Sequence, residues 1–525
     1  MQRSLALLAG VLVSTPVVFV QQAFAQNEAR EVEEVITTGT RAQERSSSES
    51  PAPIDVITGE DFTNQAETDL ANLVRNVVPS FNVNTQPISD AATIVRPANL
   101  RGLAPDHTLV LVNGKRRHRA AVISWLGNGV ADGSQGPDLA TIPSIALKQV
   151  EVLRDGASSQ YGSDAIAGVM NFILKDSNDG ASIEAKFGQY SEGDGDLYSI
   201  AGNIGLPFSD DGFANLSFEY SESDPTDRSV QRTDAANLIA AGNTAVANPA
   251  QIWGSPLVKD DIKLFGNVGL DLGNETEFYA HANLSSKFVD GGFYFRNPNT
   301  RGGVFSGDGG ATLLVGDLLD AEDGVLDGTA GCPTITITND VPDQAALNQV
   351  INDPNCFTFQ EIFPGGFTPR FGGDVSDAQI VAGVRGEMKN GLRWDVSASG
   401  ARNEVDFFIR NTVNASLGPN TPTFFNPGDY TQYEQAVNAD FGFSPTPETN
   451  LAFGAEFRNE EFQITTGDEA SFEIGPLAEQ GFSAASNGFP GFSNIAGGKN
   501  SRENVALYVD GEWEATDELL LGAAV

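Results

Sequence analysis

The chain has 525 residues, of which 31 are Lys or Arg and 70 are Asp or Glu, and its formal net charge at pH 7 is −39. This length exceeds that of one ordinary domain, so we expect at least two. A chain this acidic repels phosphate groups, which argues against nucleic acid as a partner.

The N-terminal residues have the pattern of a cleavable export signal. One basic residue, Arg3, precedes an apolar run over residues 5–20 and a small-x-small site over residues 23–25. This pattern predicts a signal peptide over residues 1–25. The run is shorter than the roughly 20 apolar residues of a spanning helix, which favours cleavage over anchoring. Because no later stretch is apolar enough for a helical span, any insertion further along must use strands.

A short peptide rich in β-branched residues follows the signal, and such residues favour extended backbone. The polar run over residues 43–50 behind it favours flexibility. We therefore expect residues 26–49 to be an extended peptide with a flexible linker, and the alternative is an ordinary disordered tail. The peptide consists of Glu33, Glu34, Val35, Ile36, Thr37 and Thr38.

Residues 50–176 alternate apolar strand-like segments with one helical pattern. That pattern runs from Asp61 to Val78 and ends at Pro79. A compact mixed α+β domain is predicted. Glycines punctuate its last strands, as expected where backbone turns sharply or packs closely. They lack the Gly-Lys-Ser/Thr ending of a phosphate-binding loop, so a nucleotide site is not expected.

The order of motifs in this region resembles the plug domain of TonB-dependent outer-membrane receptors, from Glu33 to about Lys175. One departure is Asp155-Gly156, where the family usually has Gly-Pro, and we expect it to change a turn and not the fold. Arg101, Glu151 and Arg154 are suited either to ion pairs or to simple solvation. The residues that carry the resemblance are Arg101, Gly102, Asn113, Gly114, Glu151, Arg154, Gly156, Tyr161, Gly162, Gly168 and Asn171.

The resemblance implies a location and partners. Residues 33–38 would be the TonB box, which binds TonB, and TonB works with ExbB and ExbD. The plug would sit inside a barrel in the outer membrane of a Gram-negative cell, among lipid and lipopolysaccharide, with a periplasmic N-terminus. Plug loops that point outward meet the substrate in this family. The basic segment with Arg116, Arg117, His118, Arg119 and Trp125 is therefore our candidate for substrate contact, and a solvated charged face is the alternative.

Residues 180–525 alternate apolar and polar residues with period two, as in Leu451, Phe453, Ala455 and Phe457. A soluble sandwich would also alternate. Short turns alternate with long polar connections along the chain, and this pattern favours an outer-membrane barrel instead. We count about eleven strands of the 22 that the resemblance implies. We therefore expect a mixed α+β plug followed by an incomplete antiparallel transmembrane β-barrel, a fragment of a longer reading frame.

The sequence gives little sign of catalysis or metal binding. None of the three histidines is spaced as a metal ligand with Cys or another His, and no catalytic motif occurs. We expect neither an enzyme, a metal site nor a cofactor. Cys332 and Cys356 share one Gly- and Asp-rich stretch of an exported chain, so a disulfide is favoured.

The predicted function is energised import of a scarce small molecule. A ferric siderophore or other chelate, a carbohydrate and cobalamin all remain open, because the fold alone does not decide the substrate. The alternatives are a receptor for transmembrane signalling and a passive porin or adhesin.

Overall fold

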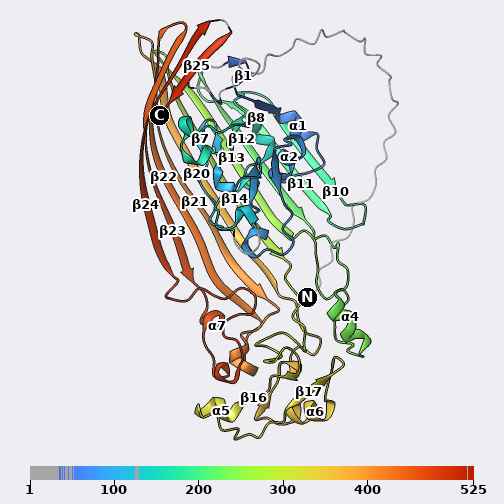
Figure 1. The fold of residues 1–525 in the computed structure, drawn as a ribbon. Coiled ribbons are helices and arrows are strands. Elements are labelled where there is room, and N and C mark those ends of the chain that lie inside the picture. The colour runs from blue at the N-terminus through green and yellow to red at the C-terminus, as the bar shows by residue number, and fades with distance from the viewer. Residues whose placement is uncertain are drawn as a thin grey trace, which may run out of the picture.

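The computed structural model describes residues 35–36, 38–39, 41, 45–46, 50, 52–124, 129–516 and 518–525. Figure 1 shows a tall curved sheet, which we call the wall, with the N-terminal part of the chain on its concave inner face. The long connections gather at one end of the wall. Within the described residues, no helix combines the length and the apolarity that a membrane span requires.

The N-terminal part, which we call the plug, is built on a five-stranded sheet. The sheet is antiparallel except between β6 and β9, which are parallel. Its apolar core includes Phe62, Leu73, Val150 and Phe172, all fully buried. The strand order is β3 (Ile54–Thr58), β8 (Leu147–Leu153), β9 (Gly168–Leu174), β6 (Thr108–Val112) and β7 (Lys115–Arg116), and β4 (Phe81–Val83) pairs separately with β5 (Ala98–Leu100).

Two helices replace the single helix predicted from Asp61 to Val78. They are α1 (Gly59–Thr63) and α2 (Leu70–Val77). The break has a local cause, since the Asp69 side chain accepts a hydrogen bond from the Asn72 N–H and so caps a new helix. The plug also contains the short helix α3 (Ser158–Tyr161).

The wall is one continuous antiparallel sheet in which successive strands are neighbours, apart from the jump over the small strands β15 to β19. Its eleven strands are β10 (Ala181–Gly188), β11 (Leu197–Pro207), β12 (Gly212–Ser223), β13 (Leu257–Gly273), β14 (Thr276–Gly291), β20 (Arg370–Glu387), β21 (Leu392–Arg410), β22 (Phe424–Thr446), β23 (Thr449–Thr466), β24 (Gly498–Thr516) and β25 (Leu519–Ala524).

The alternation along these strands is polar inside and apolar outside. On β12, Asn215, Ser217 and Glu219 are buried towards the plug, while Leu216 and Phe218 are about 40–45% exposed on the other face. A soluble protein has the reverse arrangement, with apolar residues buried. The outer face of the wall therefore carries an apolar surface, and the inner face meets the plug through polar side chains.

The prediction of a barrel left incomplete by truncation is wrong. In the described residues, the strands pair one after another as a single curved sheet around a plug. The predicted total of 22 strands came from the resemblance, and the pairing of the eleven strands in the described residues does not support it.

The two ends of the wall differ sharply in their connections. Tight turns, such as residues 274–275 and 447–448, join strands at one end, which we call the short-turn end. The opposite, long-loop end carries residues 224–256, 292–369, 411–423 and 467–497 and one short connection, residues 189–196. Its elements are α4 (Thr233–Ala240), β15 (Thr312–Leu313), β16 (Gly316–Asp317), α5 (Leu318–Asp323), β17 (Ile335–Thr338), β18 (Val341–Pro342), α6 (Gln344–Asn352), β19 (Cys356–Phe357) and α7 (Glu469–Phe472).

Three long connections merge into one folded unit, which we call the loop cap: residues 292–369, 411–423 and 467–497. They share an apolar core in which Phe305, Phe357 and Phe359 of the first connection pack with Val413 of the second and Phe482 of the third. Cys332 and Cys356 form a disulfide within the first connection. Because a shared core orders its segments together, the loop cap is a preassembled body and not a set of independent loops.

Candidate functional site

The peptide that precedes the plug is bound to it. Strand β1 (Val35–Ile36) pairs with β2 (Arg45–Ser46), with Val35 opposite Ser46. Glu33, Glu34 and Thr37 lie outside the described residues. The backbone of two predicted TonB-box residues is thus already engaged in a strand pair.

Thr38, the last residue of the predicted box, is held by a buried carboxylate. Its backbone N–H and its hydroxyl both donate to Glu151 Oε2, at 2.9 and 2.5 Å. Asn171 Nδ2 donates to the Thr38 hydroxyl at 3.2 Å, and the Gly39 N–H donates to the Tyr161 hydroxyl at 3.1 Å. Burial raises the pKa of the Tyr161 hydroxyl, so it stays protonated at neutral pH. Two residues of the plug motif, Glu151 and Asn171, therefore bind the end of the box, and Tyr161 binds the residue that follows it.

Arg41 extends this docking to the wall. Its guanidinium lies 3.7 Å from the centroid of the Tyr508 ring on β24 and 3.6 Å from Asp440 Oδ1 on β22. It also donates to the Gln160 carbonyl in the plug. A single cation thus bridges plug and wall at the short-turn end.

Lys115 makes a second bridge beside it. Lys115 Nζ lies 3.1 Å from Asp395 and 3.6 Å from Asp440. Burial alone would lower the pKa of this ammonium, but Asp395, Tyr279 and Asp440 outweigh it and raise the pKa above its ordinary value. Lys115 therefore remains a cation, and the plug is held to the wall by charge.

Arg117 and His118, which were predicted to contact the substrate, lie deep in the interface between plug and wall, where both are nearly fully buried. They converge on Asp377 of β20, at 2.5 Å from Arg117 and 2.8 Å from His118 Nε2. Asn283 and Asn403, on the neighbouring strands, donate to the same carboxylate at 2.7 and 3.0 Å. Asp377 is thus the hub of the interface.

Arg116 and Arg119 join a second cluster, around Asp164 of the plug. Arg116 lies 2.5 Å from this carboxylate, and Arg119 and Arg458 lie 3.6 and 3.5 Å from it. Burial opposes ionisation, but these three cations hold the pKa of Asp164 below its usual range. Arg119 also reaches Glu460 of β23 at 3.5 Å. Arg117, His118 and Arg119 therefore pair with carboxylates of the wall, whereas the Arg116 side chain pairs within the plug, and substrate contact stays a prediction. Trp125 lies outside the described residues.

The other motif residues shape backbone or lie at the surface. At Gly168, φ is +151°, and an added Cβ would stand 2.2 Å from the Leu153 carbonyl oxygen, so only glycine fits. Arg101 and Arg154 make partly exposed ion pairs, with Asp155 at 3.7 Å and Asp55 at 2.7 Å. A Cβ added at Gly156 would lie 3.3 Å from the Ile166 carbonyl oxygen. The remaining motif residues have positive φ, and they are Gly102, Asn113, Gly114 and Gly162.

Sequence reasoning missed the partners of these residues on the wall. Asp377, Arg458 and Glu460 are polar positions within alternating strands, and that alternation was the available signal. In the described part of the chain, no group of three or more His, Cys, Asp or Glu side chains is arranged to hold a metal ion.

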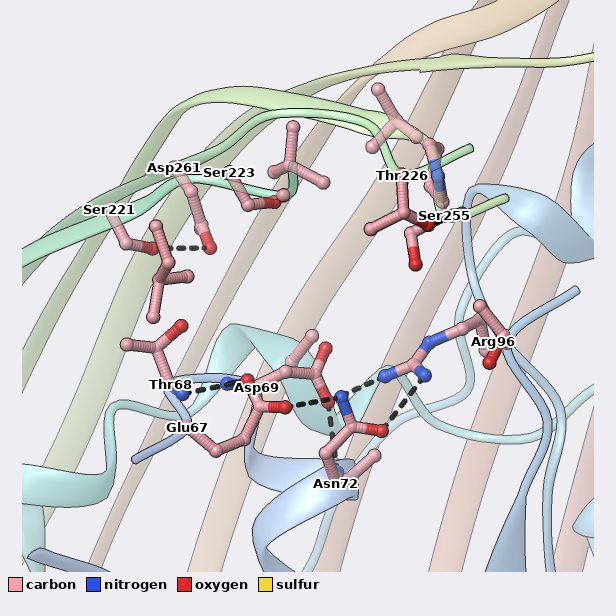
Figure 2. A pocket seen from close by; sticks show the side chains of 18 of the residues that line it. Glu67, Thr68, Asp69, Asn72, Arg96, Ser221, Ser223, Thr226, Ser255 and Asp261 are labelled. Atoms are coloured by element: carbon pink, nitrogen blue, oxygen red, sulfur yellow. Dashed lines mark hydrogen bonds and ion pairs between the residues drawn. The ribbon is translucent and has the colours of Figure 1, made fainter. Parts of the chain in front are cut away.

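A cavity of about 540 Å³ separates the plug from the wall near the long-loop end, and we call it the chamber. Figure 2 shows polar side chains of the plug, among them Glu67, Asp69, Asn72 and Arg96, facing Ser221 and other polar residues of the wall. Arg96 lies 2.6 Å from Asp69. Burial raises the pKa of the Asp69 carboxyl, but Arg96 and Lys287 outweigh burial and bring the net pKa below its usual range.

At the long-loop end, an aromatic cluster joins the plug to the loop cap and to wall strands β20 and β21. Phe293, Phe371, Phe407 and Phe489 pack with plug residues such as Ile94.

Asp90 of the plug lies on the same side, near the Arg296 guanidinium. Burial raises the pKa of the Asp90 carboxyl to about 6, although Arg296 opposes the shift. The charge of Asp90, and with it the electrostatic interaction between plug and loop cap, therefore changes with pH.

The chain can now be compared with known proteins. Residues 46–169 match the TonB-dependent receptor plug domain. The ferric enterobactin receptor PirA of Pseudomonas aeruginosa is 28% identical over 274 residues, which cover 46% of this chain and 34% of that protein. The vitamin B12 transporter BtuB of Vibrio cholerae is 30% identical over 175 residues, or 33% of this chain and 25% of the transporter.

Solved receptors share the fold at lower identity. A ferric enterobactin receptor of Pseudomonas aeruginosa superimposes with a TM-score of 0.53 at 16% identity, covering 91% of this chain and 57% of that one. The siderophore receptor PirA of Acinetobacter baumannii gives a TM-score of 0.50 at 17% identity, covering 90% and 56%. The chain thus spans just over half the length of these receptors. Residues 46–169 are thus similar to the plug domain of TonB-dependent receptors, and the fold of the chain is similar to that of solved siderophore receptors.

Proposed function

We propose that the chain acts in the TonB-driven import of a scarce nutrient across the outer membrane. The observation that carries this proposal is the docking of the predicted TonB box. Thr38 is bound to Glu151 of the plug, and Arg41, three residues on, contacts both plug and wall. A pull on the box therefore acts directly on the plug.

The wall supports a place in the membrane. Its apolar outer face and polar inner face are the pattern of an outer-membrane sheet, in which lipid meets the outer side chains. Under this proposal, residues 1–25 are the signal, 26–49 the box and linker, 50–176 the plug and 180–525 the wall with its connections. The short-turn end faces the periplasm, and lipid and lipopolysaccharide surround the wall.

The partner would be TonB, energised by ExbB and ExbD. An extended peptide binds by adding a strand, and main-chain hydrogen bonds give the affinity. Because β1 already pairs with β2, that pair must separate before Val35 and Ile36 join TonB. The docked state is therefore closed to TonB, and loosening the plug would release the box.

The substrate remains a proposal as well. Relatives are named for ferric enterobactin and for vitamin B12, and both compounds are suitable first probes. The proposal treats the protein as a transporter without catalysis of its own.

A Val35→Pro variant tests the function. Proline removes the backbone N–H that strand addition needs, whereas Val35→Ala keeps it. We expect Val35→Pro to abolish binding to purified TonB and energised uptake of whichever probe the unmodified protein imports, and Val35→Ala to retain both. Uptake that survives both Val35→Pro and dissipation of the proton gradient would refute import by TonB and favour a passive pore.

A further inference from the structure

The chamber lies where contact between plug and wall is interrupted. Towards β20 to β23, the plug is bonded by buried polar groups, including Arg117 with Asp377 and the Ala121 N–H with Asn403. On the side that faces β11 to β13, the plug does not contact the wall closely, and a cavity of about 540 Å³ separates them. This volume is within the range of small-molecule sites.

The chamber opens beside the one short connection of the long-loop end. Tyr190 and Gly195 of residues 189–196 line it, together with Thr226 and Ser255 at the ends of the next connection. The loop cap arises from connections that follow β14, β21 and β23, and those strands lie further along the sheet. No residue of the loop cap is among those that line the chamber.

The charges that line the chamber are unequal, with six carboxylates against three cations, although one of the six, Asp261, lies 3.3 Å from the buried Lys263 outside the lining. The carboxylates are Glu67, Asp69, Asp138, Glu222, Asp224 and Asp261, and the cations are Arg75, Arg96 and Lys287.

The three cations are already engaged. Arg96 lies 2.6 Å from Asp69, Lys287 lies 3.0 Å from Asp138, and Arg75 donates to a backbone carbonyl at 3.1 Å. An anionic ligand would have to break these contacts and leave a buried carboxylate unpaired, which is costly.

The remaining lining groups suit hydrogen bonding to a polar ligand. The hydroxyls of Ser223 and Ser255 and the amide of Asn72 face the chamber from wall and plug (Figure 2). The Glu67 carboxylate accepts from the Thr68 N–H and from Asn72 at 2.8 and 2.9 Å. These groups offer donors and acceptors to hydroxyl, amide or ammonium groups of a ligand.

We propose that the chamber binds a polar ligand that is neutral or cationic and disfavours anionic chelates. This inference rests on the proposed function, because it names the substrate class of the same receptor. The proposed ligand class differs from the ligand named for the enterobactin-receptor relatives, because ferric enterobactin is an anionic ferric catecholate.

A cysteine in the chamber measures its electrostatic preference directly. The two native cysteines are joined in a disulfide, so Ser223→Cys introduces a single free thiol. Its reaction rates with a cationic and an anionic methanethiosulfonate are compared with those of a small thiol in solution. We expect the ratio of the rate with the cationic reagent to the rate with the anionic reagent to be about tenfold higher in the chamber than for the free thiol at low salt. This ratio should fall as salt is added. Ser255→Cys repeats the test if the first variant does not fold.

Matched carboxylate variants localise the effect. Glu67→Gln, added to Ser223→Cys, should lower the ratio by about fourfold, the combined effect on the two reagents of one unit charge about 10 Å away in water. Glu322→Gln makes the same chemical change on an exposed helix of the loop cap and should leave the ratio unchanged. A ratio equal to that of the free thiol, or one that Glu67→Gln does not change, would overturn the proposal.

Two iron chelates of opposite charge complete the test. Ferrioxamine B, a cationic ferric trihydroxamate, should protect Ser223→Cys from a neutral thiol reagent, and ferric enterobactin should not. Equal protection by both, or protection by neither, would refute the assignment. These assays require neither TonB nor a proton gradient, so their failure and the failure of energised import can be told apart.

Discussion

The Asp377 hub gives the sharpest test of how the plug is held. Asp377→Asn keeps the size of the side chain but removes its charge from Arg117, 2.5 Å away, when both side chains are only 1–2% exposed. Removing one partner of a buried ion pair costs about 3–5 kcal/mol, because the other charge stays buried without compensation. This is a large fraction of the roughly 5–15 kcal/mol by which a typical protein is stable.

The assay is urea unfolding in detergent, followed by tryptophan fluorescence, for Asp377→Asn, Arg117→Met and the double variant. We expect the double variant to cost at least about 2 kcal/mol less than the sum of the single changes. The matched control is the Lys148–Asp176 pair, whose atoms lie 2.9 Å apart but whose side chains are each 52% exposed. That pair should couple by at most about 1 kcal/mol. Equal coupling in the two pairs would refute the reasoning.

Three further predictions concern the box, the plug and the loop cap. Glu151→Ala removes the acceptor of both Thr38 hydrogen bonds, so proteolysis of the N-terminal segment should accelerate about tenfold or more, and an unchanged rate would contradict the docking. Asp90 holds its proton to about pH 6 in the folded protein but releases it near pH 4 when unfolded, so the stability should fall as pH rises through that window. Asp90→Asn should remove this dependence and stabilise the protein above pH 6 by about 2–3 kcal/mol in denaturation curves. Replacing Cys332 and Cys356 by Ser opens a bridge across 24 residues and should cost the loop cap about 3 kcal/mol, seen as faster hydrogen exchange there but not in the wall strands.

Much of the plug could be predicted from short motifs, because their constraints are local. The Asn113-Gly114 pair requires a turn, and its backbone has φ of +48° and +75°. The helix between Asp61 and Val78 was only partly predictable, since its apolar spacing continues across the break. The capping bond of Asp69, not the periodicity, decides where α2 begins.

The basic segment shows the limit of such reasoning. The sequence left two interpretations of Arg116 to Arg119, a ligand-contact loop and a solvated face. Only the fold brings Asp377 to within hydrogen-bonding distance of His118, from 259 residues further along the chain. No local pattern carries information over that separation.

By itself, the sequence determined which side chains of each strand share a face, because the period of two follows from the pleat of the backbone. It also determined that the plug precedes the wall, through the order of its motifs. The tertiary structure alone decided which polar residues of the wall meet which cations of the plug, and that the loops merge into one cap. It also left the chamber beside β11 to β13, because register and curvature are set by pairing between distant strands.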